Sequence, residues 1–358
     1  MDATVVDTDA HYFEPAEDIA PYFEEPWRTR ILGSWRDPES MMTNLFPGST
    51  GDQEVYGRIE RTELDTASGR GLRAPEDVAL AMDHVGVDKC IILSHRMLSF
   101  ARLEGEDARQ VVLANGYVDY MLEKVVDPSE GIYTMAPVPF KDPEAAVELI
   151  DRVADERGVV GLAFVTPGVK PPLGHRRYDV IYEAAERAGL PAVFHSGGAS
   201  LDYFYINGYE KFIETHTLGF MLNNAAQLTS LVVQGVPEKF PDLDIVFQES
   251  GLFWIPTMMY RLDAEYMKRQ SEAPLLTKRP SKYLQEFYYG TQPMEQPSNP
   301  RYLEYVFEMI GGPDRLMYTS DYPHWDYDPP SVITKQSFLS DAEKAQILGG
   351  NAEEVFDV

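Results

Sequence analysis

The sequence predicts an α/β protein built as a (β/α)8 TIM barrel, in which eight parallel strands alternate with helices. Apolar β-type runs alternate with helical patterns along the chain, which is typical of repeated βα units. Histidines or carboxylates directly follow four of these runs, at Asp9 with His11, at His195, at Glu249 and at Asp321. Residues at strand C-termini converge only when parallel strands close on themselves, so this pattern favours a barrel.

The chain contains the eight candidate strands that such a barrel requires. They cover residues 4–9, 88–93, 131–138, 159–165, 191–197, 243–249, 287–291 and 316–321. Apolar residues at helical spacing predict helices over 143–157, 178–188, 218–233 and 300–310. Residues 264–283 are expected to form a further helical excursion. We therefore expect residues 1–358 to form a single barrel.

Residues 15–74 do not fit the alternation of strands and helices. The segment is rich in Pro, Gly, Trp and Arg, has little periodicity and is too long for a simple βα connection. We interpret it as an insertion after strand 1 that lies over the barrel mouth. It is either a substrate lid or a packed loop without a gating role.

Composition excludes several classes of protein. A formal net charge of −27 disfavours nucleic acid and anionic membrane surfaces as partners, because binding phosphates needs clustered Lys and Arg. Cys90 is the single cysteine and lies in an apolar strand, so no intrachain disulfide is expected and the thiol is interpreted as structural. The N-terminus shows no signal-peptide pattern, and no apolar run reaches the roughly 20 residues of a membrane span. We expect a soluble, cytoplasmic protein.

Ligand-type side chains near the predicted strand ends indicate a metal site, since histidine and carboxylate together are the ligands of divalent transition metals. Asp9 and His11 are two apart, so their side chains share one face of a continuing strand. A carboxylate at Glu249, which ends the run Ile245-Val246-Phe247-Gln248, is costly unless it is paired or bound to a cation. The candidate ligands are Asp9, His11, Glu14, His195, His216, Glu249, Asp321 and His324.

The remaining histidines are expected to be ordinary surface or core residues. These are His84, His95 and His175. Other catalytic classes lack support, because the chain contains no Gly-x-Ser-x-Gly elbow, no Gly-x-Gly-x-x-Gly after a strand and no phosphate-binding loop.

The chain resembles the amidohydrolase-related (amidohydrolase 2) family across nearly its whole length. The stretches that carry the resemblance are 9–15, 235–243, 248–254, 321–326 and 347–352. The resemblance implies a metal-bearing distorted barrel and makes a homodimer a reasonable expectation. Members that decarboxylate aminocarboxymuconate semialdehyde or resorcylate use a metal set that Asp9, His11, His195 and Asp321 match. Where those members carry a catalytic histidine after strand six, this chain has Glu249.

The number of candidate ligands suggests a second metal ion. Eight ligands are too many for one tetrahedral zinc and suit two six-coordinate ions. The pattern resembles the TIM-barrel nonheme diiron monooxygenases of platensimycin and platencin biosynthesis. That resemblance implies two Fe and O2-dependent hydroxylation of a bulky apolar substrate, with Asp321, Glu249 and His324 in catalytic roles.

For this reading we expect an apolar wall and a local site for an acyl-CoA phosphate. The wall candidates are Tyr203, Phe204, Tyr205, Phe220, Phe253, Trp254 and Trp325. The arginine candidates are Arg28, Arg30, Arg36, Arg58 and Arg61.

Two alternatives stay open. One is a hydrolase or nonoxidative decarboxylase with a single Zn or Mn, in which the metal polarises water or substrate and Asp321 shuttles a proton. The other is a non-catalytic barrel that serves as a binding scaffold.

Overall fold

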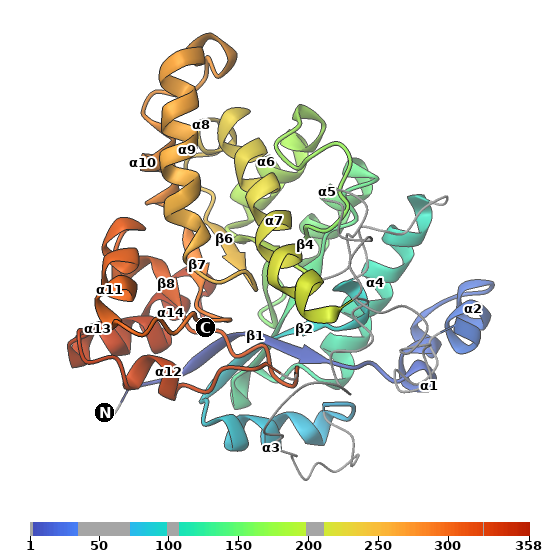
Figure 1. The fold of residues 1–358 in the computed structure, drawn as a ribbon. Coiled ribbons are helices and arrows are strands. Elements are labelled where there is room, and N and C mark those ends of the chain that lie inside the picture. The colour runs from blue at the N-terminus through green and yellow to red at the C-terminus, as the bar shows by residue number, and fades with distance from the viewer. Residues whose placement is uncertain (1–2, 35–71, 99–106, 198–210, 325) are drawn as a thin grey trace.

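The computed structural model describes residues 3–34, 72–98, 107–197, 211–324 and 326–358. Eight parallel strands form one sheet in the order β1 to β8. Their bounds are β1 Val6–Tyr12, β2 Lys89–Ser94, β3 Ile132–Pro137, β4 Val159–Val165, β5 Ala192–His195, β6 Ile245–Gln248, β7 Tyr288–Gly290 and β8 Leu316–Met317. The predicted (β/α)8 barrel is confirmed, and Figure 1 shows the strands inside a layer of helices.

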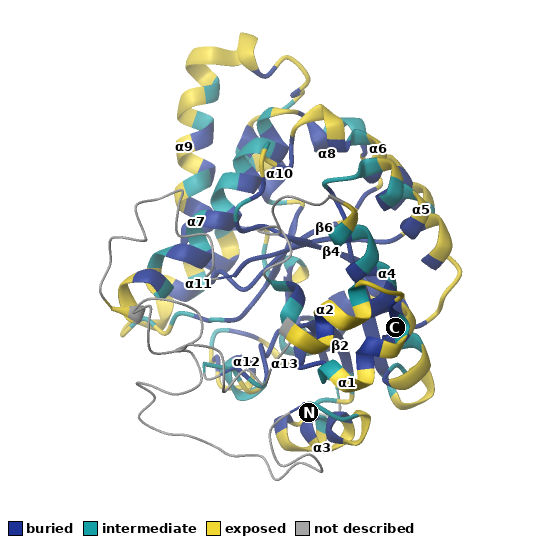
Figure 2. Cartoon of the chain, turned by 90° about the vertical axis from the view of Figure 1, so that its right-hand side faces the viewer, coloured by how far each residue is buried: buried dark blue, intermediate teal, exposed yellow. Residues whose placement is uncertain are grey.

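The helices lie between successive strands, as βα units require. Their bounds are α1 Ala16–Ile19, α2 Trp27–Ser34, α3 Pro75–Val85, α4 Asp107–Lys124, α5 Pro143–Val153, α6 Asp179–Ala188, α7 Phe212–Val233, α8 Val236–Lys239, α9 Trp254–Arg269, α10 Pro280–Leu284, α11 Pro300–Met309, α12 Ser331–Thr334, α13 Asp341–Ala345 and α14 Asn351–Phe356. Outer helices such as α5 and α9 expose one face and bury the other (Figure 2). None of the helices in the described ranges is long and apolar enough to cross a bilayer.

The strands separate two apolar cores. The larger core fills the space between the barrel and its helices, and it includes Phe194 and Phe247. The smaller core fills the barrel interior. It includes Val193 and Val246, which directly precede Phe194 and Phe247 in the same strands. Side chains that alternate between faces in this way are what a closed parallel sheet with helices outside requires.

The C-terminal helix α14 closes the N-terminal end of the barrel. Ala352, Val355 and Phe356 belong to the interior core together with strand residues such as Val6. Lys89, at the start of β2, donates to Glu353 at 2.7 Å and to the carbonyl of the last residue at 2.9 Å. The N-terminal end of the barrel interior is therefore filled by apolar side chains, and the polar site residues lie at the C-terminal end.

Hydrogen bonds outside the regular ladder join β1 to the segment after β8. The amide of Thr8 donates to Tyr318 at 3.2 Å, and the amide of Asp321 donates to the Asp9 carbonyl at 2.8 Å. The buried Asp7 carboxylate accepts from the Ser320 amide at 2.8 Å and the Ser320 hydroxyl at 2.5 Å. We call this junction the β1–β8 seam, because it completes the nearly closed barrel.

The insertion after strand 1 is described only in part. It begins with α1 and α2, and residues 35–71 lie outside the described ranges, so its role as a lid stays a prediction. Arg28 and Arg30 lie on α2, where Arg28 donates to main-chain carbonyls and Arg30 lies over the Trp27 ring. The other three arginines proposed for a CoA phosphate are not described. Cys90 is buried, as expected of a structural thiol.

We expect the seam to lose stability as the Asp7 carboxyl ionises. Burial raises the pKa of Asp7 to about 7, despite the bonds from Ser320 and the Asp9 amide that lower it. Because the folded pKa lies above the unfolded value, metal-free wild-type protein should become less stable as pH rises from about 4 through about 7. Asp7→Asn keeps the acceptor oxygen and cannot ionise, so it should remove this dependence.

The measurement is denaturant unfolding of metal-free wild type and Asp7→Asn from pH 4 to pH 9. The stability difference should grow in favour of the variant up to pH 7 and then level off, at no more than roughly 4 kcal/mol. Parallel pH profiles for the two proteins would contradict the assignment.

Candidate metal and catalytic site

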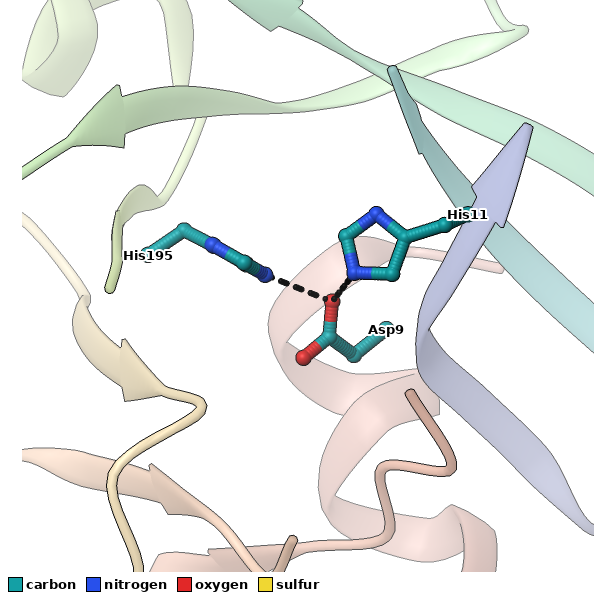
Figure 3. Close-up of side chains that lie close together, drawn as sticks. All are labelled: Asp9, His11 and His195. Atoms are coloured by element: carbon teal, nitrogen blue, oxygen red, sulfur yellow. Dashed lines mark hydrogen bonds and ion pairs between the residues drawn. The ribbon is translucent and has the colours of Figure 1, made fainter. Parts of the chain in front are cut away.

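Three of the predicted ligands meet inside the C-terminal end of the barrel. Asp9 and His11 come from β1, and His195 is the last residue of β5. Asp9 Oδ1 lies 3.0 Å from His195 Nε2 and 3.5 Å from His11 Nε2 (Figure 3). All three side chains are fully buried.

An irregularity in β1 turns the two ligands of this strand inward. The register with β2 shifts between Asp7 and Ala10. Ala10 and Tyr12 pack into the outer core, so the intervening His11 faces the interior, as does Asp9. Bulges of this kind re-aim side chains beside active sites. The prediction that Asp9 and His11 share one face is confirmed.

Asp321 brings a second carboxylate to His11, in a cluster that also contains His324. Its Oδ1 lies 3.0 Å from His11 Nε2 and 2.6 Å from His324 Nδ1, and its Oδ2 accepts from Gln292 Nε2 at 3.1 Å. Its φ angle of 64° lies in the left-handed region that non-glycine residues rarely adopt. This conformation lets both Ser320 and Asp321 find partners, Ser320 in the seam and Asp321 in the interior.

The donor atoms fit one divalent ion. Ligands about 2.0–2.2 Å from a common ion are separated from one another by roughly 3.0–3.5 Å, which is the spacing found here. Within the described part of the chain, neither ring nitrogen of His11 has a hydrogen-bond partner, and Asp9 Oδ2 has none either. Burial, and then the neighbouring His324 imidazole, lower the pKa of His11 and favour the neutral ring that binds metals.

His195 is oriented for the same task. Its Nδ1 lies 2.5 Å from the Ser196 carbonyl, so this nitrogen carries a proton and Nε2 is directed at Asp9. Burial lowers the pKa of His195, but the Asp9 and Asp321 carboxylates and the Ser196 carbonyl together outweigh burial, so the pKa of His195 is raised. A cation bound between Asp9 and His195 would take the place of a proton on His195 Nε2.

Glu249 lies on the other side of His195. Its Oε2 is 3.3 Å from His195 Nδ1, and its φ angle of 55° is again left-handed. Burial first, and then the carboxylates of Asp321 and Asp9, raise the pKa of Glu249 well above its ordinary value. The environment of Glu249 therefore favours the protonated form of its carboxyl group.

The turn that carries Glu249 is held by Glu295. The Glu295 carboxylate accepts from the amides of Leu252 at 2.9 Å and Phe253 at 3.3 Å, at the start of α9. Gly251 has a φ angle of 69°, and a Cβ there would lie 2.5 Å from Glu295 Oε1. Glycine is favoured at this position, because the left-handed φ angle strains other residues and a Cβ would displace the Glu295 carboxylate.

Three predicted ligands, Glu14, His216 and Glu249, lie apart from the clusters that could hold a metal. Those clusters are Asp9, His11 and His195, and His11, Asp321 and His324. Glu14 is fully buried without a hydrogen-bond partner for its carboxylate, and burial raises its pKa to about 7. His216 Nε2 lies 3.4 Å from Asp326 Oδ2. Among the wall candidates, Tyr203, Phe204, Tyr205 and Trp325 lie outside the described residues.

Sequence reasoning missed three residues of this site. His95, which was expected to be an ordinary residue, lies 2.9 Å through Nδ1 from His324 Nε2. Gln292 follows β7 and holds Asp321, and Glu295 holds the Glu249 turn. A signal did exist for His95, because it directly follows β2 as the recognised ligands follow their strands.

Comparison with known proteins assigns the barrel to a family. The model of the Amidohydrolase (amidohydrolase 2) family matches residues 59–358. The γ-resorcylate decarboxylase of Polaromonas sp. strain JS666 is 23% identical over 247 residues, which cover 66% of this chain and 74% of that protein.

Solved structures share the fold. An amidohydrolase from Mycobacterium avium subsp. paratuberculosis superposes with a TM-score of 0.78 at 18% identity, over 99% of this chain and 100% of that one. The 5-carboxyvanillate decarboxylase of Sphingomonas paucimobilis gives 0.70 at 20% identity, over 99% of both chains. A dihydroxybenzoic acid decarboxylase from Polaromonas sp. JS666, with bound manganese and 2-nitroresorcinol, gives 0.68 at 18%, over 99% and 97%.

These findings overturn the expectation of a diiron monooxygenase. The relatives are decarboxylases, and a solved neighbour holds manganese with an aromatic inhibitor, which supports a divalent metal but neither two Fe nor O2 nor acyl-CoA. The physical error lay in counting ligand-type residues. Glu14, His216 and Glu249 lie outside the clusters, and His324 is hydrogen-bonded through both nitrogens.

We expect His11→Ala to abolish tight metal binding. His11 belongs to both candidate clusters, so its loss should reduce bound Mn²⁺ from about one per chain to near zero and remove the thermal stabilisation that the ion gives wild type. Metal analysis after equilibrium dialysis, with thermal unfolding with and without chelator, measures both. His216→Ala serves as the control and should keep the ion. Equal Mn²⁺ content in the two variants would contradict the site.

Proposed function

The chain belongs to the amidohydrolase family, and we propose that within it this protein is a metal-dependent nonoxidative decarboxylase of an aromatic acid. The observation that carries the proposal is the meeting of Asp9, His11 and His195 at the barrel mouth, with Asp321 beside His11 and Glu249 beside His195. Similar proteins are named for dihydroxybenzoate and carboxyvanillate decarboxylation, so a hydroxybenzoate is the substrate class to test first.

In this proposal Asp9, His11, His195 and Asp321 hold one divalent ion, with Mn²⁺ the first choice. Mixed imidazole and carboxylate ligands suit Mn²⁺ as well as Zn²⁺. When bound, the ion supplies a positive charge that orients the substrate carboxylate and stabilises negative charge that develops during the reaction.

The reaction requires one proton and no oxidant. The bond between the ring carbon and its carboxylate breaks, the electron pair stays on the ring carbon, and carbon dioxide leaves. The ring carbon must then take up a proton. Glu249 is suited to donate it, because burial and the carboxylates of Asp321 and Asp9 raise the pKa of Glu249 well above its ordinary value.

Asp321 and His324 have a different role in this scheme. Asp321 is fixed through both oxygens, by His324 and His11 on one side and by Gln292 on the other. Such partners orient a metal-binding carboxylate and tune its basicity. We propose that Asp321 orients the substrate together with the ion, while His324 keeps Asp321 in position.

The homodimer expected from the family resemblance also stays a proposal.

The direct test is an assay of Mn²⁺-loaded protein with 2,6-dihydroxybenzoate, 5-carboxyvanillate and unsubstituted benzoate. Carbon dioxide release and the change in substrate absorbance are recorded with and without oxygen. The proposal expects release from at least one hydroxybenzoate at the same rate in both atmospheres. Metal-loaded protein that releases none from a broad hydroxybenzoate panel would refute it.

Glu249→Gln tests the proton donor. The amide has nearly the same size as the carboxylic acid but cannot protonate the ring carbon, so kcat should fall by roughly 10²–10⁴-fold with Mn²⁺ content unchanged. Glu183→Gln, on the exposed face of α6, is the matched control and should behave as wild type. A Glu249→Gln variant with wild-type kcat would remove Glu249 from the mechanism.

A further inference from the structure

We propose that His95 is a positioning residue that fixes His324 and, through it, Asp321. His95 follows β2, a strand that contributes none of the proposed metal ligands. Its Nδ1 lies 2.9 Å from His324 Nε2, and His324 Nδ1 lies 2.6 Å from Asp321 Oδ1. Three side chains from two loops, one after β2 and one after β8, therefore form one line that ends on a carboxylate of the candidate metal cluster. The inference deepens the proposed function and rests on it.

The order of donors and acceptors along this line is determined by its inner end. Asp321 as a carboxylate can only accept, so the short contact requires a proton on His324 Nδ1. A neutral His324 then has a lone pair on Nε2, and the contact with His95 requires a proton on His95 Nδ1. His95 is thus the donor that selects one tautomer of His324.

His95 is itself held firmly enough to act on its neighbour. Its amide donates to the Tyr12 carbonyl at 3.0 Å, which extends the β1–β2 pairing past the strand ends. Its ring stacks on Phe13, with centroids 4.1 Å apart and planes at 25°. Arg73 lies on the Phe13 ring as well, 5.7 Å from its centroid. The stack restricts the His95 ring to one orientation, in which Nδ1 faces His324.

His324 needs such a support because it is packed against a metal-binding candidate. Its ring lies 4.3 Å from the His11 ring, at an angle of 31°. With the donor of His95 gone, His324 can change tautomer or rotate. It then no longer donates to Asp321 Oδ1, the oxygen that also faces His11 Nε2. Partners of this kind typically change metal affinity or activity by about 10–100-fold.

The test compares two substitutions of His95 that separate the donor from the ring. His95→Asn places an amide N–H near the position of Nδ1 but removes Nε2, whereas His95→Phe keeps a ring on Phe13 and removes the donor. We expect His95→Phe to lower kcat by about 10–100-fold with little change in KM. His95→Asn should stay within about threefold of wild type. His175→Asn and His175→Phe, at an exposed histidine before α6, are the controls.

Each other outcome overturns the assignment. Equal losses in both His95 variants would mean that His95 acts through Nε2, on the substrate or as a proton carrier. Wild-type kcat in His95→Phe would mean that only the ring stack matters.

Two readouts do not depend on decarboxylation, so they separate this inference from the proposed function. First, the Kd for Mn²⁺ should rise about tenfold in His95→Phe and remain near wild type in His95→Asn. Second, nitrogen NMR of ¹⁵N-histidine-labelled, metal-free protein should show His324 protonated on Nδ1 in wild type, with a different tautomer or exchange in His95→Phe. A proton on Nε2 of His324 in wild type contradicts the proposal, whatever reaction the protein catalyses.

Discussion

The β1–β8 seam is the constraint on which the site depends. Asp9 and Asp321 belong to opposite ends of the chain, and each functions only if the first strand lies beside the last. The seam joins them through the Asp321 amide and the Asp9 carbonyl, while Asp7 holds Ser320 next to them. The same residues that close the barrel thereby position two of the carboxylates at its mouth. Closing the barrel therefore also assembles this part of the site.

Left-handed backbone at Glu249 and Asp321 shows how the strand ends are used. Each residue directly follows one whose side chain has its own structural partner, Gln248 with Thr8 and Ser320 with Asp7. A regular strand would send neighbouring side chains to opposite faces. The unusual φ angle, at a cost of order 1–3 kcal/mol each, brings the carboxylates into the interior instead. The rest of the barrel supplies that energy.

The fold and the centre of the site were accessible from the sequence because both follow from short-range patterns. Apolar runs marked all eight strands, and Asp9, His11, His195 and Asp321 each directly follow or end such a run or its extension. His95 and Gln292 were missed because their role depends on which neighbour they reach in three dimensions. The diiron expectation was wrong for a related reason. Sequence alone does not reveal how far burial shifts the pKa of a carboxyl such as Glu249 or whether an imidazole such as His324 is already hydrogen-bonded.

The helix α14 has a consequence for how molecules reach the site. Its apolar residues fill the N-terminal end of the barrel together with the interior core, so the described residues offer no passage through that end. Under the proposed function, substrate would enter and product would leave at the C-terminal end. Product release would then have to precede binding of the next substrate, and its rate would limit turnover whenever it is slower than the chemical step.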